Sequence, residues 1–161
     1  MKIKLGVFFG GKSVEHEVSI ITALQAIENI NKEKYDIVPI YIAKDNKMYC
    51  GDFVDDIKQY TNIDNLKRIS TQVTLSLKDN KTVLLRTNKK FYENEVYDYI
   101  DVAFPIVHGT NVEDGTLQGY LKMFNLPYVG CDVTSSAVGM DKYVSKTILK
   151  ENNIPVLDCK C

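Results

Sequence analysis

The sequence predicts an α/β fold, with an open, mainly parallel sheet and helices on both faces. Three observations support this fold class. Residues 3–9 are nearly all apolar, as expected for a strand that is buried on both sides. Residues 15–29 repeat apolar side chains at three- and four-residue steps, which predicts an amphipathic helix. Residues 35–43 form a second apolar run, so the chain opens with a strand–helix–strand unit, whose crossover is right-handed in nearly all proteins.

Composition fits an ordinary globular domain. The chain has 161 residues, of which 45% are hydrophobic and 25% charged, so disordered and fibrous classes are excluded. With 20 Lys+Arg against 21 Asp+Glu, the charge gives no support to a nucleic-acid or anionic-membrane partner. Apolar runs such as 102–107 are far shorter than the roughly 20 residues that span a bilayer. Residues 1–11 lack the small-residue cleavage site of a secretion signal, and we interpret them as the first strand.

Four cysteines occur, and none belongs to a CxxC motif. The pair Cys159 and Cys161 has no second pair that would complete a zinc site. We therefore expect Cys50, Cys131 and this pair to be free thiols in a reducing, cytoplasmic compartment.

Residues 44–99 differ from the first 43 in being polar and rich in Asn, Asp and Lys. Alternating apolar residues at 73–77 and 83–85, on either side of Asp79 and Asn80, predict a hairpin. We also expect a short strand at 90–92. This region is interpreted as an insertion or sheet edge, and catalysis is expected elsewhere.

Regular α/β order resumes at residue 101. A buried strand is predicted at 102–107, with pairing disturbed near its end because Pro105 has no N–H to donate. The remaining expected elements are a helix at 116–124, a strand at 127–129, a short helical turn or loop at 134–139 and a helix at 141–152. In the last helix Val144, Ile148 and Leu149 are expected to face inward.

Two loops are candidates for a functional site, because ligands of open α/β sheets bind at the carboxyl ends of the strands. The first loop, 10–17, begins with Gly10 and Gly11, which allow positive φ and close backbone approach. Ser13 or its polar neighbours can cap the helix that follows. Glu15 and Glu17 lie about 200° apart around that helix, so only one of them can face a ligand. Two interpretations of these glutamates are possible: both are solvated surface carboxylates, or one of them binds a cationic amine.

The second loop, 108–115, starts with one of only two histidines in the chain. His108 follows a buried strand, where it can hydrogen-bond a carboxylate or transfer a proton; a surface histidine before a simple turn is the alternative. His16 lies between two glutamates and is predicted to be solvated. Lys142, at the start of the last helix, can reach a phosphate or simply point into solvent.

Four segments together carry a more specific signal: residues 10–19, 108–121, 126–142 and 146–156. Their order and spacing resemble those of D-alanine–D-alanine ligases of the ATP-grasp superfamily. The resemblance leaves 44–99 unmatched. It implies that ATP phosphorylates the carboxylate of one D-alanine, and that the amine of a second D-alanine attacks the acyl phosphate to form the dipeptide of peptidoglycan.

The resemblance also implies roles for individual residues. Glu15 would orient the ammonium group of the first D-alanine, and His108 would lie beside its carboxylate and the acyl phosphate. Ser19 would join the hydrogen-bond network around Glu15, and Lys142 would contact an ATP phosphate. The two glycines, Gly10 and Gly11, would keep the backbone low over the substrate. ATP and Mg²⁺ are the implied cofactors, and the implied partner is a second copy of the chain in a homodimer.

The resemblance divides the chain into a Rossmann-like (pre-ATP-grasp) substrate-binding domain, residues 1–133, and the start of an ATP-grasp central domain, residues 134–161. We expect the metal ligands to lie beyond Cys161, so none is assigned here and this chain alone is expected to be inactive. Val112 stands where the family usually has glycine, and a different loop shape is expected there. Two alternatives remain: a D-Ala–D-Ser or D-Ala–D-Lac ligase of the vancomycin-resistance type, and a non-catalytic α/β binding or dimerisation module.

Overall fold

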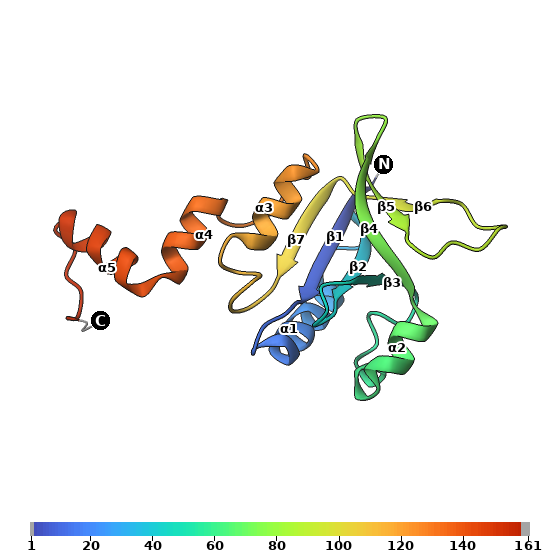
Figure 1. Cartoon of the computed structure of the whole chain (residues 1–161), viewed down its shortest axis with the longest axis horizontal. Helices are drawn as coiled ribbons and strands as arrows, with labels where there is room; N and C mark the ends of the chain where they lie inside the picture. Colours follow the sequence, from blue (N-terminus) through green and yellow to red (C-terminus); the bar gives the residue numbers. More distant parts are fainter. Residues whose placement is uncertain (1, 159–161) are drawn as a thin grey trace.

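The computed structural model describes residues 2–158 and contains one seven-stranded sheet with helices packed on both faces (Figure 1). The α/β class is confirmed. Along the sheet the strands run in the order β6-β5-β4-β3-β2-β1-β7. The strands are β1 (Ile3–Gly10), β2 (Tyr35–Ile42), β3 (Met48–Cys50), β4 (Thr71–Lys78), β5 (Lys81–Arg86), β6 (Val96–Tyr99) and β7 (Val102–Ile106). The helices are α1 (His16–Asn29), the 3₁₀ helix η1 (Ile57–Thr61), α2 (Ile63–Ile69), α3 (Thr116–Met123), α4 (Val133–Met140) and α5 (Lys142–Glu151).

The sheet is mixed rather than mainly parallel. Strand β1 pairs in parallel with β2 on one side and β7 on the other, whereas β2 through β6 pair antiparallel. The predicted hairpin is present as β4 and β5. The prediction of a strand at 90–92 is wrong, because the strand of this region is β6, at Val96–Tyr99. The polar region 44–99 therefore extends the same sheet, and strand β4 buries only the alternate residues Val73 and Leu75.

Pro105 does not disturb the pairing of β7 with β1, contrary to expectation. The register continues from Phe8 opposite Pro105 to Phe9 opposite Ile106. Two residues earlier, the N–H of Ala103 points away from β1 and donates to the carbonyl of Pro127 at 2.8 Å. Since residues two apart in a strand point the same way, the nitrogen of Pro105 also faces the open edge. Residues 127–129 form only an isolated bridge there.

The core has two layers, one on each face of the sheet. Leu5, Val7 and Phe9 of β1 pack against α1, while Phe8 between them faces the opposite layer with Leu117 and Leu121 of α3. This alternation explains why β1 is apolar at nearly every position. Complete burial of each such side chain contributes about 1.5–3 kcal/mol. The two layers fix the carboxyl end of β1 between α1 and α3.

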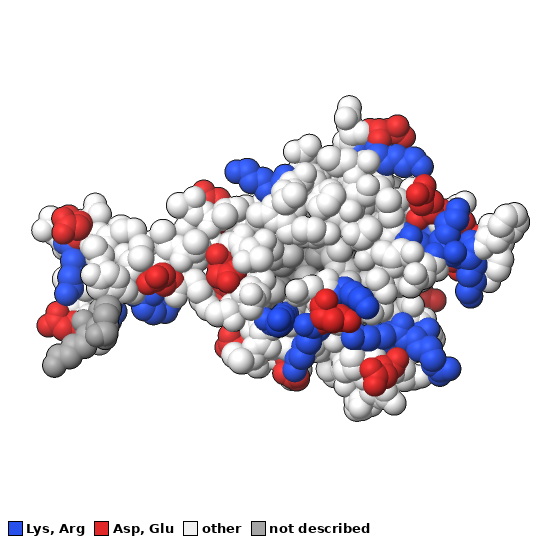
Figure 2. All heavy atoms as spheres, in the orientation of Figure 1, with Lys and Arg blue, Asp and Glu red and all other residues white. Residues whose placement is uncertain are grey.

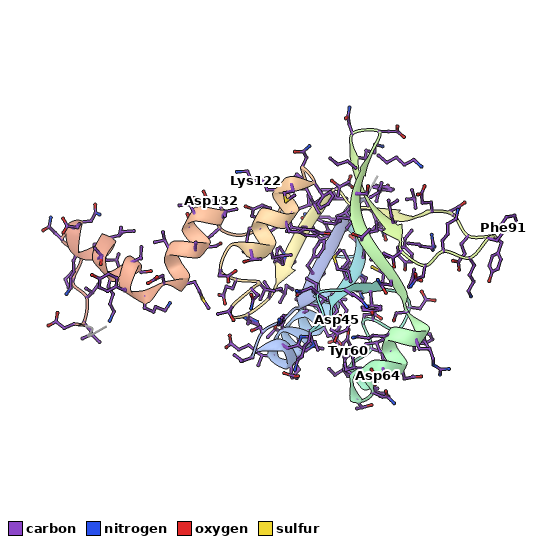
Figure 3. All side chains as sticks on the ribbon, in the orientation of Figure 1. Asp45, Tyr60, Asp64, Phe91, Lys122 and Asp132 are labelled. Atoms are coloured by element: carbon purple, nitrogen blue, oxygen red, sulfur yellow. The ribbon has the colours of Figure 1, made fainter. Side chains whose placement is uncertain are left out.

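The C-terminal helices extend away from the sheet (Figure 1). Helix α4 replaces the expected helical turn, and Asp132 caps it by accepting from the Ser135 N–H at 2.7 Å; Figure 3 labels Asp132 at this helix start. Helix α5 is present as expected. Its side chains Val144 and Ile148 are 37% and 44% exposed, so the prediction that they face inward is wrong.

The surface carries charges of both signs, interspersed on the face that Figure 2 shows. No helix within residues 2–158 is both long and apolar enough to cross a membrane. Cys50 is a buried free thiol and Cys131 an exposed one, as expected. Cys159 and Cys161 lie outside the described residues.

Candidate functional site

A cleft of about 520 Å³ lies where β7 ends, between the loop after β1 and helices α3 and α4. Its polar lining comes from both predicted loops and from the C-terminal helices: Glu15, Glu113, Gln118, Ser135, Ser136 and Lys142. A second hollow of about 410 Å³ lies between β3, β4 and α3 and is lined by none of the predicted site residues. The first cleft is therefore the candidate site.

The two glycines at the end of β1 adopt the positive φ that the sequence predicted. Their φ angles are 91° at Gly10 and 90° at Gly11. A Cβ on Gly10 would lie 2.4 Å from the carbonyl oxygen of Ile42, and one on Gly11 would lie 2.4 Å from Cγ1 of Val112. Only glycine fits at these two close approaches. The buried Val112 side chain therefore packs directly over the first loop.

Ser19 joins the ends of two neighbouring parallel strands. Its fully buried hydroxyl accepts a hydrogen bond from the Gly10 N–H at 2.7 Å and donates one to the Ile106 carbonyl at 2.5 Å. Gly10 ends β1 and Ile106 ends β7, so one side chain of α1 holds both ends. Ser19 was expected in a network around Glu15; its N–H donates to the Glu15 carbonyl at 3.0 Å, while its hydroxyl bonds the backbone of these two strands.

His16 is buried, and the prediction of a solvated histidine is wrong. The side chain is 2% exposed. Its Nδ1 lies 2.6 Å from the Gly11 carbonyl oxygen, and its Nε2 lies 3.1 Å from the Tyr41 hydroxyl. The flanking glutamates point elsewhere because α1 turns about 100° per residue. His16 thus supports the backbone of the glycine loop from inside the core.

Glu15 is exposed and lines the cleft, whereas Glu17 faces away from it. The Glu15 N–H donates to the Ser13 hydroxyl at 3.1 Å, which satisfies one of the free N–H groups at the start of α1. Glu17 pairs with Lys44 at 2.7 Å, and the hydrogen bond from this lysine lowers the pKa of Glu17. The two carboxylates therefore face different surroundings, as the helical spacing predicted.

The second loop is closed by its own acidic side chains. Glu113 accepts a hydrogen bond from the Gly109 N–H at 2.9 Å. Asp114 accepts from the N–H groups of Asn111 and Thr116 at 2.8 and 3.1 Å. Partial burial acts to raise the pKa of Asp114, but the hydrogen bonds from Thr116 and Asn111 outweigh it and leave the pKa below its ordinary value. The loop is therefore rigidly closed by charge-assisted hydrogen bonds.

The two loops touch each other. A Cβ on Gly109 would lie 2.9 Å from Oε2 of Glu15 and still closer to the Ser13 hydroxyl. The Asn111 side-chain amide donates to the Lys12 carbonyl at 3.1 Å. Glycine at 109, with a φ of 82°, is required for this approach. The carboxylate of Glu15 and the backbone that follows His108 thus lie side by side.

His108 is half-buried, and its ring faces α1 rather than the cleft lining. Its Nε2 lies 3.0 Å from Oγ1 of Thr22. Thr22 follows Glu15 by seven residues, two turns of helix, so both lie on the same face of α1 as Ser19. The structure therefore places Glu15 and His108 on the same edge of the sheet.

Lys142 lines the cleft opposite these loops, at the first residue of α5. Its Nζ donates to the Gly139 carbonyl at 3.1 Å and is otherwise exposed, so it can offer a positive charge to an anion. Within residues 2–158, no three His, Cys, Asp or Glu side chains are grouped as a metal site requires.

Three further residues of the site were not singled out from the sequence. Thr22 could have been found from its helical spacing to Glu15. Glu113 and Gln118 belong to the second motif but look like ordinary loop and helix residues. Gln118 is 8% exposed and lines the cleft, and its Oε1 has no hydrogen-bond partner within the described part of the chain.

Fold and site together define an α/β domain whose cleft joins an acidic side chain, a histidine-bearing loop and a lysine. The profile described as D-ala D-ala ligase N-terminus matches residues 4–131, and the chain belongs to this family. It is 43% identical over 157 residues to the D-alanine--D-alanine ligase of Thermosipho melanesiensis, covering 97% of this chain.

Solved structures agree with this membership. The D-alanine-D-alanine ligase of Coxiella burnetii superposes with a TM-score of 0.82 at 36% identity, over 98% of this chain and 43% of that one. The VanG D-Ala:D-Ser ligase of Enterococcus faecalis gives a TM-score of 0.76 at 31% identity, over 98% of this chain and 44% of that one. The chain spans 42% of the length of the Thermosipho relative.

Replacing Ser19 by alanine tests the connection between the two strands. Ser19→Ala leaves the buried N–H of Gly10 and the carbonyl of Ile106 without their partner, so we expect a loss of about 1–3 kcal/mol in the free energy of unfolding. Urea denaturation measures it. Ser76→Ala is the matched control, because the Ser76 hydroxyl makes no hydrogen bond among the described residues, and it should change stability by less than about 0.5 kcal/mol. Equal effects of the two substitutions would show that the connection contributes nothing.

Proposed function

We propose that this chain forms the site for the first D-alanine of an ATP-dependent D-alanine–D-alanine ligase that makes the dipeptide of peptidoglycan in the cytoplasm. The observation that carries the proposal is the contact between the Glu15 carboxylate and the loop of His108, at the mouth of one cleft. Membership of the ligase family supports it. Under this proposal, residues 1–133 are the substrate-binding domain and residues 134–161 begin the ATP-grasp domain.

The chemistry of the side chains suits a small zwitterion. Glu15 presents a carboxylate beside a glycine backbone, where an ammonium group can approach without steric hindrance from a Cβ. A charge-assisted hydrogen bond of this kind contributes about 1.5–3 kcal/mol. His108, in the adjacent loop, would lie beside the substrate carboxylate. These groups act by orienting the substrate and balancing charge, which is the main protein contribution in phosphoryl transfer.

Lys142 is the residue of this chain that would hold a phosphate of ATP. It lies across the same cleft from Glu15, and its ammonium group is a compact charge suited to phosphate. ATP supplies the phosphoryl group that activates the carboxylate, and Mg²⁺ would accompany it. The described residues offer this one cleft lysine to ATP and no grouped carboxylates to the metal.

A ligase that joins D-alanine to D-serine is the second candidate function. The similarity to the VanG D-Ala:D-Ser ligase covers nearly the whole chain. Both reactions would use the same first D-alanine, so the roles proposed for Glu15 and His108 hold in either case.

Neutralising Glu15 should weaken binding of D-alanine. Glu15→Gln keeps the size of the side chain but removes the charge facing the ammonium group, so we expect the Kd of D-alanine to rise at least about tenfold. Isothermal titration of the chain measures this. Glu17→Gln is the matched control. It removes the carboxylate charge of Glu17, which lies two residues further along and pairs with Lys44, and it should leave the Kd of D-alanine unchanged. Equal Kd values for Glu15→Gln and the unmodified chain would exclude the proposed role.

We further propose that two copies of the chain form a homodimer through the outer face of α1. Val18 and Ile21 of α1 are 49% and 50% exposed, and Val14, in the turn before the helix, is 92% exposed. Ile21 lines a hollow together with the half-exposed Ile57 of η1. A continuous exposed apolar stripe is typical of an interface. Light scattering should give the mass of two chains, and a strict monomer at high concentration would contradict this arrangement.

A further inference from the structure

The contact between His108 and Thr22 determines which nitrogen of the imidazole carries the proton. Oγ1 of Thr22 lies 3.0 Å from Nε2 of His108 and, within its own helix, 3.0 Å from the Val18 carbonyl and 3.2 Å from the Ser19 carbonyl. A hydroxyl has one proton to donate and two lone pairs with which to accept. The three neighbours therefore compete for one proton.

The carbonyls of Val18 and Ser19 determine where the Thr22 proton points, because a carbonyl oxygen can only accept a hydrogen bond. If the Thr22 proton turned toward the imidazole, the lone pairs of Oγ1 would face two carbonyl oxygens at close range. Donation to Val18 removes this repulsion and is the usual arrangement of a threonine within a helix. The Thr22 oxygen then accepts from the imidazole, which requires a proton on Nε2 of His108.

We propose that Thr22 is a positioning residue that holds neutral His108 as its Nε2–H tautomer, so that Nδ1 is the nitrogen that must gain a proton before it can donate to a ligand carboxylate. The inference rests on the proposed function, in which His108 meets the carboxylate of the first substrate. Nδ1 makes no hydrogen bond to any other residue in 2–158, so it is the nitrogen that can take up a proton. A proton added there leaves the Nε2–H bond to Thr22 intact. The ring orientation is therefore the same in both charge states.

His16 provides an internal reference, because the structure predicts the other neutral tautomer for it, with the proton on Nδ1. Its Nδ1 must carry a proton, because it lies 2.6 Å from the Gly11 carbonyl, which only accepts. Burial raises the pKa of Tyr41, so the Tyr41 hydroxyl stays protonated and donates to Nε2 of His16. The chain has two histidines, and the structure predicts one of each tautomer.

Nitrogen NMR of the ¹⁵N-labelled 161-residue chain tests this inference directly. At alkaline pH, where ordinary imidazoles are neutral, long-range ¹H–¹⁵N correlations distinguish protonated from unprotonated ring nitrogens. We expect pure Nε2–H at His108 and pure Nδ1–H at His16. Thr22→Val should give His108 a mixture of tautomers and make its Nε2 proton exchange with solvent at least about tenfold faster, as loss of one hydrogen bond implies. Thr22→Ser, which keeps the hydroxyl, should retain the original pattern.

The His16 pattern serves as the folding control in every variant, since it depends on contacts that Thr22 does not make. Nδ1–H at His108 in the unmodified chain would overturn the inference. So would an unchanged tautomer and exchange rate in Thr22→Val. Failure of the chain to bind D-alanine would instead contradict the proposed function and leave the tautomer result standing, so the two failures are distinguishable.

Discussion

The buried hydroxyl of Ser19 holds together the two strand ends from which the whole site is built. Parallel strands β1 and β7 end at Gly10 and Ile106, and each strand then leads into a loop that carries a candidate site residue. A hydroxyl that accepts from one strand and donates to the other fixes the separation of the two strand ends, and the hydrogen bond from Asn111 to the Lys12 carbonyl then joins the loops themselves. Removal of such a group leaves two buried polar atoms unsatisfied.

Rigid support continues outward from this connection. His16 fixes the Gly11 carbonyl from the core, and Thr22 holds the ring of His108 from the same helix. Helix α1 therefore presents one face of polar side chains to the strand ends, while its apolar stripe packs against the sheet. Glu15, at the start of that polar face, is left exposed in the cleft. Side chains that act by orientation require this kind of fixed backbone.

Much of the fold followed from the sequence, and the differences have physical causes. The strand–helix–strand opening was predictable because burial on both faces and a 3.6-residue period leave strong signals. The strand β3 and helix α2 were not, since with three and seven residues they are too short to show a clear periodicity. His16 was misjudged because its neighbours in sequence are charged, whereas its surroundings in space are Tyr41 and the Gly11 carbonyl. Long-range contacts of this kind leave no local pattern.

The sequence predicted the two loops of the candidate site, but not the hydrogen bonds that hold them together. Gly10 ends strand β1 and Gly11 and Glu15 follow it, and the residue types alone indicate close backbone approach and a negative charge. The link from Ser19 to Ile106 joins positions 87 residues apart, so only the folded chain reveals it. Family resemblance suggested which loops matter, whereas the hydrogen bonds explain why they meet.

The most direct test of this account is an amide NMR titration of the chain with D-alanine, with L-alanine as the stereochemical control. If the loops joined through Ser19 form one binding site, D-alanine will shift the signals of Gly10, Gly11 and Gly109 together, with a single dissociation constant, and L-alanine will shift them much less. Shifts confined to one of the two loops, or to the hollow beside β3 and β4, would contradict the account.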